Sequence, residues 1–477
     1  MGQILLREIF GLAHFSYPLS KYFKRAWFGW HISNNASFED YASTDYVTHF
    51  SRPGNRAGFS VNDFVPPEYK FRRLCPAQRS LPPNEVYPNC LSPPAAFCQA
   101  SAMTRTEKLL AELIALPSIN PAFALPHDPK AGEKSVSDFL LSVGASAGLE
   151  VELQKVLPDR SNVIIRLQPS GRVRQTILLV PHMDTVVASD SQLTPFRRQG
   201  RLYGRGACDT KGSVAAMFTA LMELARTKSR PRQTAIVLAG VVDEENAQAG
   251  SRMLAASGIK ANLAIVGEPT RLQGITAHKG TVWLQLETRG RSAHGSTPHL
   301  GRNAILEMAQ VVEILETRYA SQLLRKKHKL LGTATVNVGT INGGRQPNIV
   351  PDSCTIRIDR RTIPGETEAG IIRDIKSLLA KQKLSVRISN PKLAPSPALE
   401  TNYQLPLVGS FLQTIGQKRP IGVNYFCDAA VLSAAGIPSI VFGPGDIAQA
   451  HTADEWISLA SLEKGKNLLL KFLKSLD

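Results

Sequence analysis

Cysteine is scarce in this chain, and long apolar segments are absent. Only six of the 477 residues are cysteine, and no two of them have the C-x-x-C spacing of a redox or zinc motif. This excludes a disulfide-stabilised secreted scaffold, and we expect free thiols, as in a reducing, cytoplasmic compartment. No apolar run approaches the roughly 20 residues that a membrane-spanning helix needs, so we expect no membrane partner.

Acidic residues are outnumbered by basic ones. The chain has 56 Lys and Arg against 39 Asp and Glu, which gives a formal net charge of +17. A field of that sign would steer anionic small molecules toward the protein and would attract nucleic acids without specificity. The sequence lacks an arginine-rich helix, a zinc knuckle and an aromatic–basic sheet motif, so we expect no specific nucleic-acid partner.

Four near-continuous apolar runs predict buried strands. They cover residues 177–180, 235–242, 263–266 and 440–442 and lack polar alternation, as is typical of parallel strands covered on both faces. Between the first two runs, residues 212–225 place apolar side chains at helical spacing. Strands and helices that alternate in this way predict an α/β fold, with an open, mostly parallel sheet and helices on both faces.

Acidic residues and histidines recur at or beyond the ends of these strands. The residues concerned are His182, Asp184, Asp209, Glu244, Glu245, Glu268 and His451. In open α/β sheets, ligands bind outside the carboxyl ends of the strands. We therefore expect the fold to bring these side chains into one site.

Carboxylates and imidazoles in this number suit a pair of divalent metal ions in a hydrolytic site. Two ions about 3.5–4 Å apart need one bridging carboxylate, and together they lower the pKa of a shared water. Five ligand positions then suffice, which leaves one carboxylate of the Glu244–Glu245 pair as a general base. Asp184 lies two residues after His182 on the same side of an extended strand, where it is placed to accept the other ring N–H of His182.

Each residue taken singly has an ordinary structural explanation. Asp209 and Glu268 could cap helices, Asp184 could belong to an Asx turn, and His451 could be a simple surface or core histidine. Such residues behind one strand after another are hard to explain by coincidence, so the sequence favours a metal centre.

Five motifs occur in a fixed order between Met103 and the C-terminus. They are His182-x-Asp184, Gly204-x-Gly206-x-x-Asp209-x-Lys211-Gly212, Glu244-Glu245, Gly267-Glu268-Pro269-Thr270, and Gly443-Pro444-Gly445 followed by His451. In order and spacing this set resembles the co-catalytic metallopeptidase family of acetylornithine deacetylase, succinyl-diaminopimelate desuccinylase, aminoacylase and glutamate carboxypeptidase. The motifs are most similar to those of the acetylornithine deacetylase-like members.

The resemblance implies a set of metal ligands. His182 and Glu268 would bind one ion, Glu245 and His451 would bind the other, and Asp209 would bridge them. The ions implied are two divalent ions, with zinc expected and cobalt or manganese as alternatives.

The resemblance also implies that Glu244 is the general base and that Asp184 orients His182. Three positions depart from the family pattern: Asn246 follows the paired glutamates where Gly is common, Cys208 precedes the bridging aspartate, and residues 295–298 replace an Ala-containing turn. None of them removes a ligand, so they bear on substrate preference or rate.

The pattern changes at residue 281, where apolar and polar residues begin to alternate. The elements predicted from there are strands at 281–287, 333–341, 353–359 and 384–388 and helices at 304–315 and 371–379. Their order is β-α-β-β-α-β, the ferredoxin-like split unit. We therefore predict an inserted domain at 281–389, which the resemblance implies is a lid that also forms a homodimer. The catalytic domain would comprise residues 103–280 and 390–477.

Three residues of the inserted domain match family positions at the substrate. The resemblance implies that His294 polarises the scissile carbonyl, commonly from the partner subunit, and that Asn348 contacts the substrate. Arg361 would bind a substrate carboxylate, since a guanidinium can donate two parallel hydrogen bonds to it. Arg360, on the opposite face of the same segment, is the alternative.

Residues 1–102 contain many aromatic residues and prolines but no sustained helical or strand period. The first 30 residues make a poor secretory signal because Arg7 and Glu8 interrupt any apolar core. We expect the segment to be disordered or an upstream extension that is not part of the native protein, which would then start at Met103. A degenerate organelle-targeting sequence is the alternative.

The sequence thus predicts a metal-dependent hydrolase that cleaves the amide bond of N-acyl amino acids, as a deacetylase or desuccinylase does. Arg361 and backbone N–H groups of the loop at Gly443 and Gly445 would bind the substrate carboxylate. A dipeptidase or carboxypeptidase with the same site is one alternative. A catalytically silent, metal-dependent binding protein is another, although such a protein has no use for Glu244 as an unligated base.

Overall fold

The computed structural model describes residues 102–227, 230–391 and 396–477. The expectations for residues 1–101 lie outside these described residues. Helix α2 (Arg105–Ala115) begins directly after Thr104, whose hydroxyl caps it by accepting the N–H of Glu107 at 3.1 Å.

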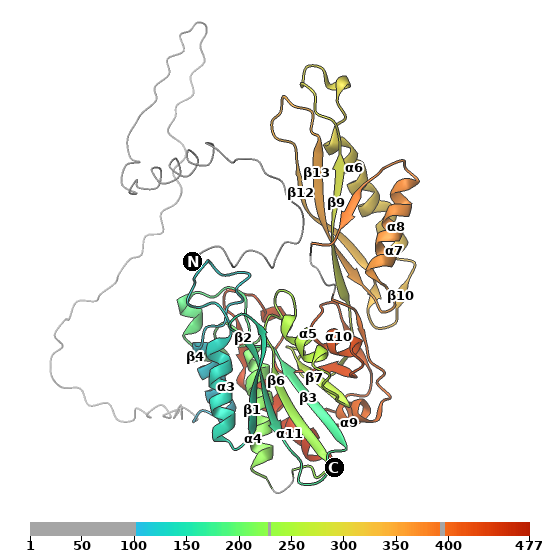
Figure 1. Cartoon of the computed structure of the whole chain (residues 1–477). Helices are drawn as coiled ribbons and strands as arrows, with labels where there is room; N and C mark the ends of the chain where they lie inside the picture. The colour runs from blue at the N-terminus through green and yellow to red at the C-terminus, as the bar shows by residue number, and fades with distance from the viewer. Residues whose placement is uncertain (1–101, 228–229, 392–395) are drawn as a thin grey trace, which may run out of the picture. The chain divides into compact units, whose positions relative to one another are not determined.

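A nine-stranded sheet forms the centre of the larger part of the molecule (Figure 1). Its strands are β1 (Glu150–Leu157), β2 (Arg160–Leu167), β3 (Gln175–Pro181), β6 (Thr234–Gly240), β7 (Leu263–Gly267), β8 (Ile275–His278), β15 (Leu399–Glu400), β16 (Ile421–Val423) and β17 (Ser439–Val441). Their order is β1-β2-β6-β3-β7-β17-β8-β15, with β16 beside β8. The four central strands β6, β3, β7 and β17 are parallel to one another and coincide with the four predicted apolar runs.

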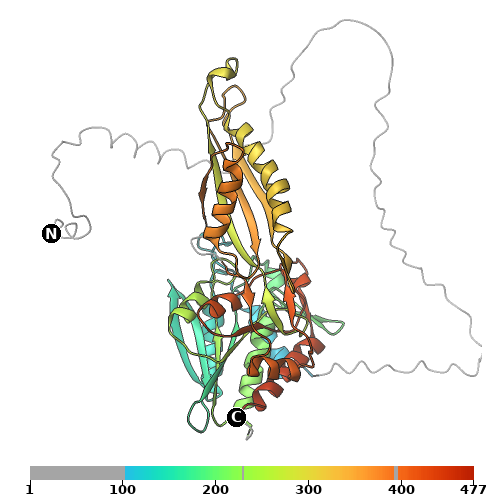
Figure 2. The same ribbon diagram turned by 90° about the vertical axis from the view of Figure 1, so that its right-hand side faces the viewer.

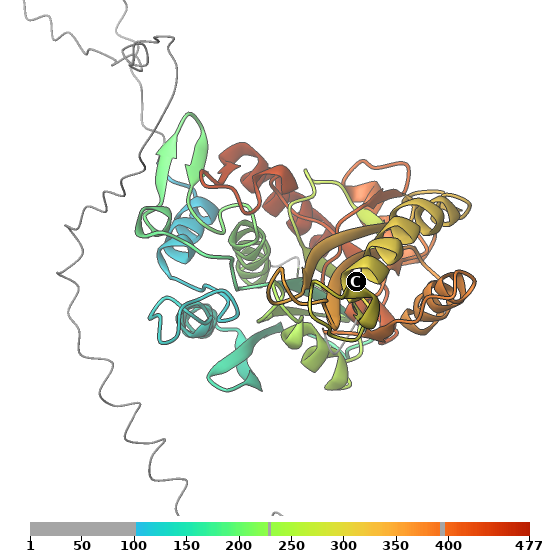
Figure 3. The same ribbon diagram turned by 90° about the horizontal axis from the view of Figure 1, so that it is seen from above.

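Helices cover both faces of this sheet because both faces of its central strands are apolar. In β3, Ile177 and Leu179 pack into one buried cluster, and Leu178 and Val180 pack into another. The helices on the first face are α2, α3 (Lys134–Ser146), α4 (Lys211–Ala225), α9 (Pro406–Thr414) and α11 (Leu459–Lys474), and those on the second are α5 (Ala249–Ala256) and α10 (Ala429–Ala434). Figure 3 shows α4 between α2 and α11. The predicted α/β fold class is confirmed.

A small three-stranded sheet lies beside this layer and was not predicted. Its strands are β4 (Phe196–Arg198), β5 (Arg201–Tyr203) and β18 (Trp456–Ser458), in the order β18-β5-β4. It joins the chain just before Asp209 to the chain just after His451. Short 3-10 helices also occur, at Asp190–Leu193, Pro298–Leu300 and Ile447–Gln449.

The elements from β9 to β14, which we call the lid domain, form a separate four-stranded antiparallel sheet. Its strands are β9 (Gly280–Arg289), β12 (Thr335–Gly343), β13 (Ser353–Thr362) and β14 (Arg387–Ser389); its helices are α6 (Ala304–Ile314), α7 (Ala320–Leu323) and α8 (Glu368–Ala380); and a hairpin links β10 (Lys327–His328) to β11 (Gly332–Thr333). The order β12-β13-β9-β14 is that of the ferredoxin-like unit.

The lid sheet has one buried face, which explains its alternating sequence. In β9, Val282, Leu284 and Leu286 are buried against α6 and α8, whereas Trp283 on the other face is 40% exposed. Figure 2 shows the lid helices on one face of the lid sheet. The helix predicted at 304–315 is longer in the structure, because a π-helical turn at Leu315–Tyr319 joins α6 to α7. Within the described ranges, no helix is both long and apolar enough to cross a lipid bilayer.

Candidate active site

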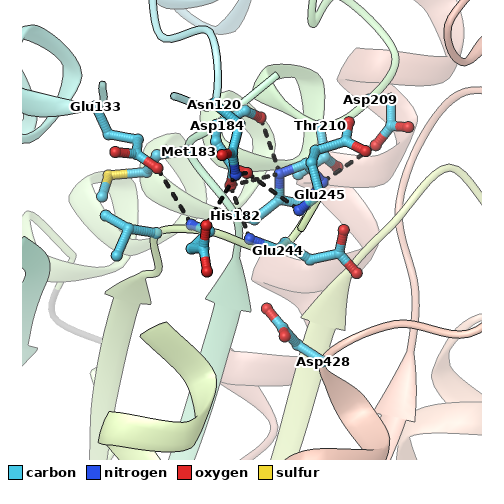
Figure 4. A network of polar contacts seen from close by, with 12 residues as sticks. Asn120, Glu133, His182, Met183, Asp184, Asp209, Thr210, Glu244, Glu245 and Asp428 are labelled. Atoms are coloured by element: carbon cyan, nitrogen blue, oxygen red, sulfur yellow. Dashed lines mark hydrogen bonds and ion pairs between the residues drawn. The ribbon is translucent and has the colours of Figure 1, made fainter. Parts of the chain in front are cut away.

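The predicted histidines and carboxylates converge at the carboxyl ends of the parallel strands. Figure 4 shows five of them: His182, Asp184, Asp209, Glu244 and Glu245. His182 directly follows β3, and Glu268 directly follows β7. Glu244 and Glu245 come four and five residues after the end of β6, because the strand ends at Gly240 and not at residue 242 as predicted. Asp209 lies in the loop between β5 and α4, and His451 follows the 3-10 helix Ile447–Gln449.

Two groups of side chains have the proximity that a metal ion requires. In the first, one donor atom each from His182, Glu244 and Glu268 lie within 4.8 Å of one another. In the second, donor atoms of Asp209, Glu245 and His451 do the same. The groups contain all five predicted ligands and the predicted base. The donor set of imidazole nitrogens and carboxylates fits two divalent ions.

Asp209 lies between the two histidines. Its Oδ1 is 3.1 Å from Nε2 of His182, and its Oδ2 is 3.4 Å from Nε2 of His451. Burial raises the pKa of Asp209, but the hydrogen bonds from the two histidines outweigh burial and the net pKa falls. A carboxylate that turns one oxygen to each group has the geometry of a bridge between two ions.

His182 is 2% exposed, and its ring is held from the side opposite to Asp209. Nδ1 lies 3.0 Å from the backbone carbonyl oxygen of Asp184 and 3.5 Å from its carboxylate Oδ1. This contact leaves Nε2 directed at Asp209 and at Glu268, whose Oε1 is 3.9 Å away. Asp184 therefore holds the ring mainly through its backbone, although the sequence suggested its side chain.

The carboxylate of Asp184 instead holds the loop that carries the two glutamates. It accepts the backbone N–H groups of Glu244 and Glu245, each at 3.1 Å, and Nδ2 of Asn120 at 2.8 Å. One buried carboxylate thus fixes the backbone of a residue from each metal group.

A buried network behind Asp184 was missed in the sequence. Asn120 also donates to Asp243 at 3.0 Å, and Arg160 bridges Asp243 at 3.1 Å and Glu133 at 2.5 and 2.7 Å. Asp243 has a φ of +68°, a left-handed conformation that is unfavourable for a non-glycine residue and persists where surrounding contacts impose it. The network supplies such contacts next to the paired glutamates.

Glu244 and Glu268 are in an environment that disfavours their charged forms in the metal-free chain. Burial raises the pKa of both well above the usual value, and neighbouring carboxylates, including Asp428, raise it further. Asp428 is itself buried, accepts the Ser251 hydroxyl at 2.5 Å, and has a pKa raised to about 6 by burial. Divalent ions would relieve this crowding of negative charge.

Metal binding should release protons and should be tighter at higher pH. Hydrogen bonds to Asp209 and Glu245 raise the pKa of His451 to about 10, so its ring is protonated at neutral pH in the metal-free chain. A metal ion binds only the neutral ring and must displace that proton. Zinc titrations should therefore give a heat that depends on the ionisation enthalpy of the buffer, and weaker binding at pH 6 than at pH 8. Equal affinities at both pH values would contradict this.

The lid domain places His294 and Asn348 side by side. The N–H of Gly295, next to His294, donates to the carbonyl of Asn348 at 2.8 Å, and the His294 ring contacts the Ser296 hydroxyl at 2.7 Å. Both side chains are exposed. Among the described residues, no hydrogen bond or ion pair connects them with the two metal groups.

Of the two candidate arginines, only Arg361 has an accessible guanidinium. Arg360 is 1% exposed and contacts Glu366 at 2.5 Å and the Tyr319 hydroxyl at 3.2 Å. Arg361 is partly exposed, pairs with Asp359 at 3.0 Å, and lies 5.4 Å above the ring of Phe426. Phe426 is two residues before Asp428, so Arg361 lies beside a segment that borders the metal groups.

The backbone N–H groups of Gly443 and Gly445 are already engaged. The first donates to the Thr270 hydroxyl at 3.1 Å and the second to the Ser461 hydroxyl at 3.4 Å. Gly443 serves close packing instead, since a Cβ there would lie 2.3 Å from the Ser213 hydroxyl oxygen and 2.5 Å from the Glu268 carbonyl oxygen. The geometry thus argues against the prediction that these two amides bind a substrate carboxylate.

Comparisons with known proteins show the family to which the chain belongs. The model of "Peptidase family M20/M25/M40" matches residues 178–475. Acetylornithine deacetylase of Proteus mirabilis is 31% identical over 388 residues, which cover 77% of this chain and 96% of that protein. The enzyme of the same name from Myxococcus xanthus is 30% identical, over 68% of this chain and 88% of that protein.

Solved structures share the fold. A tripeptidase from Staphylococcus aureus superimposes with a TM-score of 0.62 at 20% identity, covering 78% of this chain and 97% of its own. A dinuclear metal-binding peptidase of the M20 family from Bacillus subtilis superimposes with a TM-score of 0.57 at 12% identity, with coverage of 78% and 97%. The chain belongs to the peptidase family M20/M25/M40 and is a hydrolase that acts on amide bonds.

Proposed function

We propose that this protein is a deacylase that hydrolyses the amide bond of small N-acyl amino acids with a free α-carboxylate. The observation that carries the proposal is the position of Asp209 between His182 and His451, with the Glu244 carboxylate close to His182 and Glu268 in the first metal group. The two acetylornithine deacetylases support the substrate class, since each matches this chain over most of its length.

The proposed ligands are His182 and Glu268 for one ion, Glu245 and His451 for the other, and Asp209 as the bridge. Zinc is the ion we expect, with cobalt or manganese as alternatives, because imidazole and carboxylate donors suit all three. When bound, the two ions would lower the pKa of the attacking water and polarise the scissile carbonyl.

Glu244 is the proposed general base. Its carboxylate takes a proton from the attacking water and then gives it to the nitrogen of the leaving amine. The Asp184 carboxylate holds the Glu244 N–H and so fixes the position from which the base acts.

Arg361 is the proposed partner of the substrate carboxylate, and Asn348 a further substrate contact. The surroundings of Arg361 have excess positive charge: Lys279 is 7% exposed, and burial and the two guanidiniums of Arg361 and Arg360 lower its pKa. An anionic group bound there would offset this repulsion.

The carboxylate requirement can be tested with matched substrates. N-acetyl amino acids should be hydrolysed with a much higher kcat/KM than their C-terminal amides. Arg361→Met should lower kcat/KM for the acids by about 10–100-fold, as expected when a charged hydrogen-bond partner is lost, and should leave the amides nearly unchanged. Arg357→Met, on the exposed face of the same strand, is the control. Equal turnover of acids and amides would contradict the role of Arg361.

We also propose that the protein is a homodimer through the lid domain, in which His294 of one subunit completes the site of the other. Exposed apolar residues on the lid support this: Leu306 is 63% exposed, Ile341 56% and Ile305 39%. Light scattering should give twice the mass of the chain. Mixing inactive His294→Ala with inactive Glu244→Gln should restore part of the activity through mixed dimers. A monomeric active enzyme would contradict the proposal.

Two other functions remain as alternatives. A dipeptidase would use the same residues, and the tripeptidase from Staphylococcus aureus shares the fold. A silent metal-binding protein would retain the ligands without needing a base at Glu244.

A further inference from the structure

We infer that Glu455 is a positioning residue that fixes the Asp209 loop relative to His451. Glu455 is 2% exposed, and no role was assigned to it in the sequence. Its Oε1 accepts the backbone N–H groups of Cys208 at 2.7 Å and Asp209 at 2.9 Å. Its Oε2 accepts the N–H of Gly206 at 2.9 Å and the Arg205 guanidinium at 2.9 Å.

Three backbone N–H groups of this loop have the Glu455 carboxylate as their acceptor. Residues 204–210 lie between β5 and α4, outside any strand or helix. The N–H groups of Gly204, Arg205 and Ala207 donate to backbone carbonyl groups, and those of Gly206, Cys208 and Asp209 donate to Glu455. A buried N–H without an acceptor is unfavourable, so the carboxylate selects the loop conformation.

Glu455 also belongs to the segment that carries His451. It lies four residues after that histidine and directly before β18, which pairs with β5. The N–H of Gly204 donates to the Glu455 carbonyl at 3.0 Å, which extends this pairing by one contact. The backbone and the carboxylate of one residue therefore connect two segments, and each segment brings one side chain to the second metal group.

Among the described residues, Glu455 forms no hydrogen bond or ion pair with a donor atom of the two metal groups. Glu455 accepts the backbone N–H of Asp209 and so fixes the orientation of that residue. Its replacement should therefore change metal affinity and leave substrate binding unchanged. Outer-shell residues of this kind typically change metal affinity by about 10–100-fold when they are replaced. The inference rests on the proposed metal roles of Asp209 and His451, and it is independent of the substrate.

The test is zinc affinity in Glu455→Gln, measured on the full chain by competition with a chromophoric chelator. Gln keeps the size of the side chain but turns an NH2 group toward N–H donors. We expect affinity to fall about 10–100-fold, most strongly for the ion bound by Asp209 and His451. At saturating zinc, kcat should recover and KM should equal the wild-type value, which a general packing defect would not produce.

Glu463→Gln is the matched control, since this carboxylate is also hydrogen-bonded, to Thr106 and Lys466, but on α11. Its zinc affinity should be that of the wild type. If Glu455→Gln does not fold, Arg205→Met removes one donor and should give a smaller loss in the same direction.

Unchanged zinc affinity in a folded Glu455→Gln or Arg205→Met would overturn the inference, as would an equal loss in Glu463→Gln. A wild-type chain that binds zinc but does not cleave N-acyl amino acids would overturn the proposed substrate and leave the Glu455 result valid. A wild-type chain that binds no zinc would overturn both.

Discussion

Glu244→Gln is expected to lower kcat by about 10²–10⁴-fold while the protein still binds two divalent ions per chain. The amide has the shape of the carboxylate but cannot accept a proton from water at neutral pH. The experiment is informative because Glu244 lies within 4.8 Å of donor atoms of His182 and Glu268, so proximity alone does not separate a base from a ligand. Steady-state kinetics and metal analysis of the same sample give both quantities.

Glu313→Gln provides a control for this substitution, because Glu313 is an exposed glutamate on α6. It should match the wild type in rate and metal content. If Glu244→Gln loses an ion, Glu244 is a ligand, and the base must be sought elsewhere.

Asp209→Ala is expected to lose metal and, with it, nearly all activity. Asp209 faces both histidines, at 3.1 Å from His182 and 3.4 Å from His451, so its removal affects both groups. The two rings, which share this carboxylate in the metal-free chain, would also lose a partner that raises their pKa. The metal content should fall well below two ions per chain even after dialysis against zinc.

Asp446→Ala is a suitable comparison, because this aspartate is on the nearby loop but pairs with Arg271 on the surface. It should keep both ions. Full metal content in Asp209→Ala would refute the bridging role, whatever its effect on rate.

The central strands could be predicted because nearly all of their side chains are apolar. Residues 177–180 and 263–266 are apolar throughout, as is typical of a strand that is buried on both faces. β4, β5 and β18 have three residues each, which is too short for any period to be recognised. β1 was missed because all eight of its residues are at least partly exposed, so it lacks a buried apolar face.

The convergence of His182, Glu244, Glu245 and Glu268 could be predicted because they follow the ends of the central strands, and the position of a strand end is local information. Asp209 follows no predicted strand, and it was found from its glycine-rich motif.

The supports of these residues could not be predicted, because they come from distant parts of the chain. Asn120 and Arg160 reach Asp243 across 123 and 83 residues. The sequence offered one signal for Glu455, which is its position as an acidic residue four places after His451. Its hydrogen-bond partners could not be predicted because they are 246–250 residues away along the chain.

The loop at Gly443 and Gly445 shows that glycines in a sequence do not reveal whether their backbone N–H groups are free. Glycines near a metal site suggested free backbone donors, but the structure uses them for close packing and for contacts with Thr270 and Ser461. Whether a backbone N–H is free depends on which side chains the fold brings next to it, and the local sequence does not predict those neighbours.

The most direct test of the account compares an N-acetyl amino acid with a dipeptide that has the same C-terminal residue. N-acetyl-L-ornithine and glycyl-L-ornithine, each assayed with the zinc-loaded full chain, present the same carboxylate and the same amide nitrogen and differ in whether the acyl group carries an amine. We predict a clearly higher kcat/KM for the N-acetyl compound, with acetate and ornithine as the products. Faster cleavage of the dipeptide, here and with other C-terminal residues, would contradict the deacylase and favour a dipeptidase.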